Sequence, residues 1–391
     1  MTRATAARAY PDTRQALLLR AALGEGDPAR RAWEEFAAEG GRIEELDDAS
    51  YRLLPQLYRN LEACGIGGEA MIRLRGVYRH AWYRNQMLLH AAGSAVRALT
   101  GAGVGVMALK GAAVAALYPG GLGTRPMNDV DLLVGPADLD RAVAVLGAEG
   151  FAPVLPGPLA ITRRVRHAVA LRREDGIELD LHWHLLVHGD DDRGVWDRAV
   201  RSTLSGASIL APSPADQLLH TCVHGLAADP APVRWIADAV LIIRSGVDWE
   251  VLVEEARDRD VTVVMLDSLR LLAREVGVAI PPPAIAALAG SRGSLAARLA
   301  HRAATGRFRS KTMALGLAYW DWYRRRERGR GRRPSPLGYA SFVADTKGLP
   351  GRRALAREIL RRTLAVGAEP PRGHVGPGIM CAREPTGARE P

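Results

Sequence analysis

The sequence predicts an α+β protein in which a small mixed β-sheet core is flanked by helical regions on both sides. Apolar residues recur at three-to-four spacing through the first hundred residues, which is typical of amphipathic helices. Short apolar runs bounded by glycine and proline then replace that pattern, and helical spacing returns near residue 190. These changes predict a helical region over 1–103, an α/β core over 104–190, a helical region over 191–366, and a disordered Pro/Gly-rich tail over 367–391.

The N-terminal region is predicted to consist of helices. Four segments carry apolar residues at helical spacing, namely Thr13–Leu23, Asp27–Ala38, Ala49–Cys64 and Gly68–Leu99. Asp27 is a favourable N-cap before Pro28, and two glycines, Gly101 and Gly103, end the long fourth helix. We expect this region to pack outside the core and to supply no metal ligand.

In the core, strands are predicted from short apolar runs. The predicted strands are Val104–Leu109, Asn128–Val134, Phe151–Leu155, His167–Arg172 and Ile177–His184. A short helix over Ala112–Leu117 is expected after the first strand, and an amphipathic helix over Pro136–Glu149 after the second.

Helices are predicted again in the C-terminal region, over Pro214–Leu226, Val233–Ser245, Trp249–Arg259, Val264–Val276, Pro283–Ala289, Met313–Arg326 and Arg352–Val366. This region also carries the positive charge. Residues 301–362 hold 17 Lys and Arg against 4 Asp and Glu, whereas residues 1–300 hold 33 against 36. Aromatic residues at 319–323 run into three arginines and a predicted basic loop over 324–333. That pattern fits a nucleic-acid or membrane contact, but a helix that packs its rings on the core is the favoured interpretation.

The composition is that of a soluble globular protein, with 48% hydrophobic and 25% charged residues among 391. It excludes wholesale disorder, collagen-like repeats and disulfide scaffolds. Three distant cysteines, Cys64, Cys222 and Cys381, show no metal-ligand spacing and favour a reducing compartment. No apolar run is long enough for a signal peptide or a membrane span, so we expect a cytoplasmic protein that does not engage a membrane.

A pair of aspartates marks the second predicted strand. Side chains alternate along a strand, so Asp129 and Asp131 project from one face. Two carboxylates side by side repel each other unless a positive charge lies between them, and a divalent cation is the usual solution. An exposed edge strand with two solvated aspartates is the alternative.

The last predicted strand of the core repeats this arrangement. Its apolar residues point to one face, whereas Glu178, Asp180, His182 and His184 point to the other. This pattern predicts a strand that lines a cleft, and a solvated sheet face is the alternative.

A possible phosphate site precedes both strands. Gly111 lies at a strand-to-helix turn, where a glycine lets backbone N–H groups approach an anion closely. Lys110 adds a positive charge, and Arg125 is a further candidate for phosphate contact. Alternatively, Lys110 pairs with Asp129 or Asp131.

Together these residues resemble the nucleotidyltransferase superfamily that includes DNA polymerase β, and most closely its bacterial branch of uncharacterised nucleotidyltransferases. The resemblance spans about residues 104 to 260. It rests on the segments Leu109–Gly111, Leu117–Pro119, Arg125, Asn128–Val134 and Glu178–Trp183, and more weakly on Asp216, Leu219, His220, His224 and Arg234–Asp238. The turn departs from the superfamily's usual Gly-Ser or Gly-Gly, because Ala112 follows Gly111 and Lys110 precedes it.

The resemblance implies a polymerase β-like core and transfer of a nucleoside monophosphate (NMP) from a nucleoside triphosphate (NTP), with ATP as the expected donor, by a two-metal mechanism. Asp129, Asp131 and Asp180 are the implied catalytic residues and the ligands of two Mg²⁺ ions, with Mn²⁺ as a substitute. Glu178 is the alternative third acid. The acceptor is a hydroxyl or similar group on a small molecule or peptide.

Nucleotide contacts are expected from Lys110, Gly111, Arg125 and, from a helix in the C-terminal region, His224. Asp216, His220 and His224 share one face of that helix, which is expected to form a wall of the cleft. Asp238 is expected to pair with Arg234 one helical turn away.

Three alternatives remain open. The histidines of the last strand and of this helix could form a zinc site, although no cysteine supports it. The protein could modify tRNA or another protein, with the arginine-rich segment as the tRNA-binding surface. It could also bind a nucleotide without catalysis.

Overall fold

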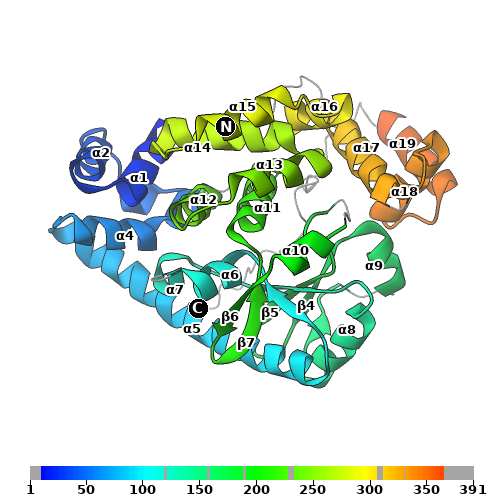
Figure 1. The fold of residues 1–391 in the computed structure, drawn as a ribbon, viewed down its shortest axis with the longest axis horizontal. Coiled ribbons are helices and arrows are strands. Elements are labelled where there is room, and N and C mark those ends of the chain that lie inside the picture. Colours follow the sequence, from blue (N-terminus) through cyan, green and yellow to red (C-terminus); the bar gives the residue numbers. More distant parts are fainter. Residues whose placement is uncertain are drawn as a thin grey trace.

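The computed structural model describes residues 10–118, 121–155, 159–187, 191–227, 233–305, 311–329 and 331–364. A mixed β-sheet lies below a broad layer of helices in Figure 1, and one long helix, α5 (Glu69–Gly101), runs from the helical layer along the sheet. The predicted α+β architecture, a mixed sheet flanked by helices, is confirmed. The predicted disordered tail lies outside the described residues.

The sheet has seven strands in the order β3-β4-β5-β2-β1-β7-β6. Their bounds are β1 Val106–Ala108, β2 Val130–Val134, β3 Ala152–Pro153, β4 Ala168–Arg172, β5 Glu178–His182, β6 Val200–Leu204 and β7 Ala207–Ala211. The β2–β5 and β1–β7 pairs are parallel, and the other neighbours are antiparallel.

The sheet continues past residue 190, where helices alone were expected. Strands β6 and β7 form a hairpin that adds to β1. Its two-residue turn is Ser205-Gly206, with φ angles of 48° and 76°. Positive φ at both positions matches the twist of paired strands, and glycine adopts it without strain.

The two faces of the sheet pack against different partners. Val130, Leu132 and Val134 of β2 share one hydrophobic cluster with residues of α5 and of α8 (Leu139–Ala148). Leu133 belongs to the other cluster, which includes residues of α11 (Pro214–Ala227) in the helical layer. Because side chains alternate along the strand, Asp131 faces the helical layer together with Leu133.

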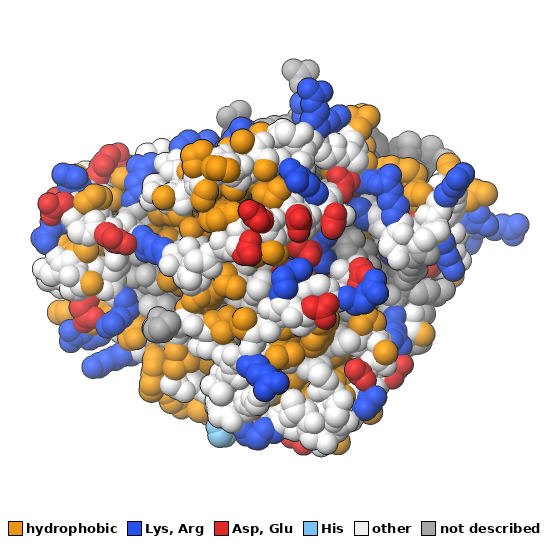
Figure 2. Space-filling view, viewed as in Figure 1, with side chains coloured by type: hydrophobic (Ala, Val, Ile, Leu, Met, Phe, Trp, Pro, Cys, Tyr) orange, Lys and Arg blue, Asp and Glu red, His pale blue; other side chains and the backbone are white. Residues whose placement is uncertain are grey.

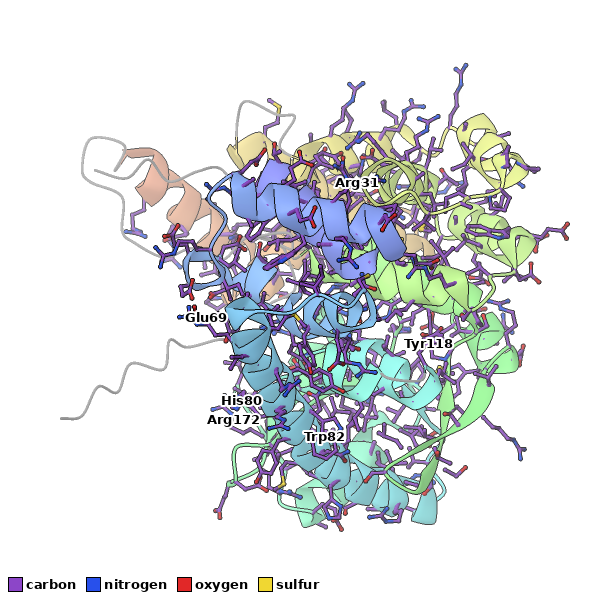
Figure 3. All side chains as sticks on the ribbon, turned by 90° about the vertical axis from the view of Figure 1, so that its left-hand side faces the viewer. Arg31, Glu69, His80, Trp82, Tyr118 and Arg172 are labelled. Atoms are coloured by element: carbon purple, nitrogen blue, oxygen red, sulfur yellow. The ribbon has the colours of Figure 1, made fainter. Side chains whose placement is uncertain are left out.

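The N-terminal helices share that helical layer with the C-terminal ones. Their bounds are α1 Thr13–Leu23, α2 Gly26–Ala38, a 3-10 turn Ile43–Glu45, α3 Asp48–Tyr51 and α4 Leu54–Ala63. The hydroxyl of Tyr10 donates to Asp267 at 2.5 Å, and Arg20 donates to the Glu275 carbonyl at 2.9 Å, both on α14 (Thr262–Val276). Seen from the side in Figure 3, α5 descends from this layer past the sheet, with Glu69 near its upper end and Trp82 lower down.

The remaining helices complete the layer and its edges. They are α6 Lys110–Leu117, α7 Gly121–Thr124, α9 Leu159–Val165, α10 Arg193–Asp197, α12 Arg234–Arg244, α13 Trp249–Asp258, α15 Pro282–Gly290, α16 Leu295–Ala304, α17 Lys311–Gly329, α18 Pro336–Thr346 and α19 Arg352–Leu364. No helix in the described part of the chain has the length and apolar character needed to cross a bilayer.

The first part of the predicted basic loop, residues 324–329, is helical, and its first two arginines are buried. Helix α17 continues to Gly329, where a basic loop was predicted. Arg324 and Arg325 are 6% and 7% exposed and both donate to Asp321 at 2.7 Å. On the face shown in Figure 2, basic side chains are scattered among acidic and hydrophobic ones. These two arginines therefore bind within the fold and do not form a free basic surface.

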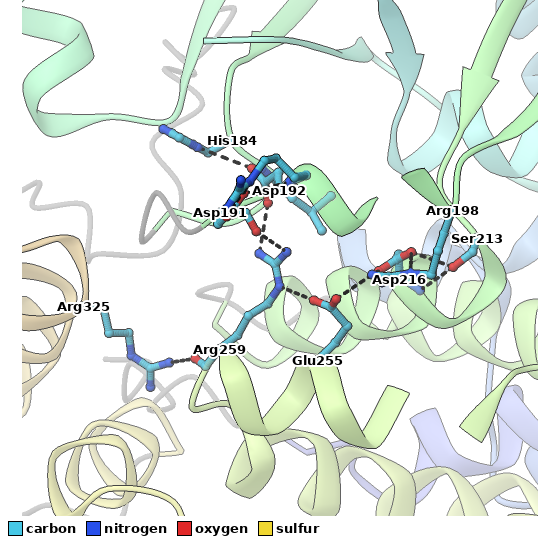
Figure 4. A network of polar contacts seen from close by, with 11 residues as sticks. His184, Asp191, Asp192, Arg198, Ser213, Asp216, Glu255, Arg259 and Arg325 are labelled. Atoms are coloured by element: carbon cyan, nitrogen blue, oxygen red, sulfur yellow. Dashed lines mark hydrogen bonds and ion pairs between the residues drawn. The ribbon is translucent and has the colours of Figure 1, made fainter. Parts of the chain in front are cut away.

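A polar network ties the helical layer to the segment between β5 and β6 (Figure 4). Arg259, at the end of α13, donates to Asp192 at 3.0 Å and to Glu255 at 2.8 Å. Arg198 joins Glu255, at 2.6 Å, to Asp216 on α11, at 2.7 Å. Because Arg325 also donates to the Arg259 carbonyl, the network connects α17, α13, α10 and α11.

Candidate active site

Two strands bring the predicted acids together. Strands β2 and β5 are parallel neighbours in which Asp131 pairs with Asp180. His182 follows two residues later on the same face of β5. The ligand atoms of Asp131, Asp180 and His182 all lie within 4.8 Å of one another, and all three side chains are buried. We call these three residues the Asp–Asp–His cluster.

Asp129 lies beside this cluster, directly before β2. Burial raises its pKa to about 6, and the negative charges of Asp131 and Asp180 add to the shift. Asp129 therefore adds a third negative charge near the two carboxylates of the cluster. A bound cation would relieve their mutual repulsion.

Lys110 forms an ion pair with Asp131 of the cluster. Its Nζ lies 2.5 Å from Asp131 Oδ1, and His182 Nε2 lies 3.0 Å from the same oxygen. Burial alone would raise the pKa of Asp131, but the Lys110 charge and the His182 hydrogen bond outweigh burial and hold that pKa well below its usual range. Lys110 has a φ of 43°, a left-handed conformation that is strained for a residue with a side chain.

Arg125 is engaged by a residue far away in the sequence. Its Nε donates to both carboxylate oxygens of Asp238 on α12, at 2.9 and 3.0 Å, and both side chains are buried. Asp238 was expected to pair with Arg234. Arg234 instead donates a hydrogen bond to the Pro126 carbonyl at 2.9 Å. The predicted phosphate contact of Arg125 stays untested.

Gly111 provides room for that arginine. A Cβ at Gly111 would collide with the Arg125 guanidinium and would lie 2.7 Å from Met127 Sδ. The space next to Gly111 is therefore filled by Arg125 and Met127. This packing explains why residue 111 is a glycine, without a bound anion.

The end of α7 and the residues after it, which we call the 122–127 loop, lead into Asp129 and are fixed by Asn85 of α5. The fully buried Asn85 amide donates to the carbonyls of Leu122 and Arg125, at 2.5 and 2.8 Å, and accepts from the Met127 N–H at 3.1 Å. Asn85 was not among the predicted site residues. Its only signal was a polar residue on the apolar face of the long helix.

Two neutral histidines of α11 face the same region. His220 and His224 contact each other edge to face, with ring centroids 5.9 Å apart. Burial, together with the Lys110 charge, lowers the pKa of His220 to about 3 and that of His224 well below its usual value. His224 Nε2 is buried and has no hydrogen-bond partner among the described residues. Asp216, the third polar residue of this face, is bound to Arg198 and Ser213 instead.

A cavity of about 270 Å³ lies between the sheet and the helical layer. Asp180, His182, His220 and His224 line its sheet end. Its other walls come from α14, α16 and α17 and are mainly apolar. His224 thus lines a cavity that adjoins the cluster, and its predicted nucleotide contact stays a prediction.

The other candidate ligands lie elsewhere. Glu178, the alternative third acid, pairs with Arg172 on the neighbouring strand at 2.6 Å. His184 turns to Asp192, with Nδ1 3.4 Å from its carboxylate. Within the described ranges, the Asp–Asp–His cluster is the one group with metal-ligand geometry, and it differs from the zinc site considered above. His182 was considered only as a ligand of that zinc site and not together with the aspartates, although its place two residues after Asp180 on the same strand face was the available signal.

Comparisons with known proteins identify the family of the chain. The family model described as "Uncharacterised nucleotidyltransferase" matches residues 49–277, more than half of the chain. A crystal structure of an antigenic nucleotidyltransferase-like protein from Paracoccidioides brasiliensis is similar at 16% identity and a TM-score of 0.33, over 54% of this chain and 95% of that one. A search of curated proteins gave no match. The chain belongs to the family of uncharacterised nucleotidyltransferases.

Proposed function

We propose that this protein transfers an NMP from an NTP, with ATP as the expected donor, to a hydroxyl group of a small molecule or peptide. The observation that carries the proposal is the pairing of Asp131 with Asp180 across parallel strands, beside Asp129, in a chain of the nucleotidyltransferase family.

The side chains present suit a divalent cation. The cluster offers two carboxylates and one imidazole, and Asp129 adds a third carboxylate beside them. Carboxylates alone suit Mg²⁺, whereas the imidazole of His182 suits Mn²⁺ or another transition metal better. Asp129, Asp131 and Asp180 would hold the two ions that the superfamily mechanism requires. Such ions would neutralise phosphate charge and lower the pKa of the acceptor hydroxyl.

Lys110 has a dual role in this proposal. Without a cation it neutralises Asp131, as the 2.5 Å contact indicates. With a cation in place its ammonium group becomes available to the triphosphate, next to the N-terminus of α6, where helix N–H groups favour anions. Arg125 and Asn85 are proposed to position the 122–127 loop, and with it Asp129.

The reaction is a substitution at phosphorus. The acceptor oxygen forms a bond to the α-phosphorus, the bond from that phosphorus to the bridging α–β oxygen breaks, and pyrophosphate leaves with the electron pair. The acceptor proton passes to a carboxylate of the site and then to solvent.

The proposal is tested by measuring which phosphate group of ATP is transferred to the acceptor. The protein is incubated with ATP labelled at either the α- or the γ-phosphate, a divalent cation and a small-molecule cell extract. We expect the α label to enter a new compound, with an equal amount of pyrophosphate released. Asp131→Asn and Asp180→Asn should abolish the transfer. Asp175→Asn, at an exposed turn between β4 and β5, is the matched control and should retain it.

Transfer of the γ label instead would show a kinase and contradict the proposal. Equal transfer by the wild-type protein and by Asp180→Asn would remove the cluster from the chemistry.

A further inference from the structure

We propose that the 270 Å³ cavity binds the acceptor, and that the acceptor is an uncharged, mainly apolar alcohol or phenol. This inference rests on the proposed function, because it assigns the second substrate of the same site.

The position of the cavity separates it from the phosphate site. Asp180 and His182 line it, whereas Lys110, Gly111 and Asp129 are not among its lining residues. The cavity therefore adjoins the Asp–Asp–His cluster without including the residues proposed to hold the triphosphate. A hydroxyl at the sheet end of the cavity would lie next to Asp180, one of the proposed catalytic carboxylates.

The walls of the cavity fit an apolar body. Alanines from β4, α16 and α17 form much of the lining, with Tyr319 and Trp322 beside them. The indole N–H of Trp322 is already bound to the Val187 carbonyl at 2.9 Å, which leaves the ring for apolar contact. An aromatic ring or a compact hydrocarbon would gain affinity here by leaving water.

Charged residues of the cavity do not call for a charged ligand in its interior. Asp321 and Arg325 neutralise each other through a 2.7 Å hydrogen bond. Arg166 and Asp180 lie at the sheet end, near or on the strands that frame the cluster. A neutral ligand therefore fits the deep part, and its polar group belongs at the sheet end.

Two buried polar atoms at that end, His182 Nδ1 and His224 Nε2, have no hydrogen-bond partner among the described residues. A buried polar atom without a partner carries a free-energy cost. A hydroxyl bound at His224 Nε2 would satisfy that atom and would orient the acceptor oxygen toward Asp180.

The test uses 2-naphthol as the probe, because it is a fluorescent, apolar phenol. The whole protein is titrated with 2-naphthol in the presence and absence of α,β-methylene-ATP, an NTP analogue that resists transfer. We expect saturable binding, with a dissociation constant of about 1 mM or tighter. The analogue should not displace the probe.

Variants of one helix locate the probe. Ala300→Phe should weaken 2-naphthol binding at least tenfold, because the ring fills the cavity. Ala304→Phe covers the same cavity from an exposed position and should act likewise without endangering the fold. Ala303→Phe, on α16 but outside the lining, is the matched control and should change binding less than twofold.

The outcomes separate this inference from the proposed function. Binding that Ala300→Phe and Ala304→Phe leave unchanged, or the absence of saturable binding, would overturn it. Displacement by α,β-methylene-ATP would also overturn it, because the cavity would then hold the nucleotide base. If the wild-type protein binds 2-naphthol but does not bind α,β-methylene-ATP, the result would contradict the proposed function alone.

Discussion

Replacing Lys110 should destabilise the cation-free protein and make its stability depend on added metal. The ammonium group is the partner of Asp131, a carboxylate that is 4% exposed. Removing one member of a buried ion pair costs about 3–5 kcal/mol because the other charge is left uncompensated. His182 still bonds the carboxylate, so Lys110→Ala should lose about 3 kcal/mol, the lower end of that range.

The backbone of Lys110 allows a sharper comparison. Its φ of 43° is strained for alanine as much as for lysine but is free for glycine. Lys110→Gly should therefore be about 1 kcal/mol more stable than Lys110→Ala, although glycine normally weakens a helix.

Guanidinium denaturation measures both effects, followed by tryptophan fluorescence and circular dichroism. Coincident curves would justify a single free energy of unfolding. In EDTA both variants should have a lower free energy of unfolding than the wild type. Mn²⁺ should reduce this difference, because the cation replaces the lost positive charge. Wild-type stability of Lys110→Ala in EDTA would refute the reasoning, as would a gap that Mn²⁺ leaves unchanged.

Three further predictions concern the surroundings of the cluster. Arg125→Met should cost about 3–5 kcal/mol of stability in denaturation, and adding Asp238→Leu should recover part of that loss, since it removes the carboxylate that Arg125→Met leaves without this partner. Gly111→Ala should weaken Mn²⁺ binding measured by calorimetry, because the new Cβ displaces the 122–127 loop, and unchanged affinity would contradict this. Lowering the pH from 7 to 5 without metal should reduce the denaturation midpoint. His220 and His224 stay neutral in the folded protein because burial lowers their pKa, whereas in the unfolded chain they take up protons near pH 6.5. Protonation therefore favours the unfolded chain, and stability is lost as the pH falls below 6.5. Asp129 opposes this trend, because its raised pKa lets the folded protein take up a proton that the unfolded chain does not. It contributes one proton, against two from the histidines. Equal midpoints at the two pH values would refute it.

Much of the site follows from strand periodicity. The alternation at Asp129, Val130 and Asp131 predicted which side chains share a face, and the same rule placed Asp180 with His182. Periodicity cannot state which strands are neighbours. The register of Asp131 with Asp180, and the choice of Asp180 over an alternative acid, depend on the parallel pairing of β2 and β5.

Contacts between distant segments were beyond sequence reasoning. The partner of Arg125 lies 113 residues away, on a helix of another predicted region, so the local pattern favoured a different pair for that aspartate. Likewise, the β6–β7 hairpin depends on a Ser-Gly turn between two short strands, and its place in the sheet comes from pairing with β1.

Mn²⁺ binding to the full-length chain, followed by electron paramagnetic resonance, tests most directly whether β2 and β5 together form the cation site. We predict that the wild-type protein binds Mn²⁺ and that Asp131→Asn and Asp180→Asn each abolish this binding. Glu178→Gln, on the same face of β5 but paired with Arg172, should bind as the wild type does. Wild-type affinity in Asp180→Asn, or loss of binding in Glu178→Gln, would contradict the proposed site.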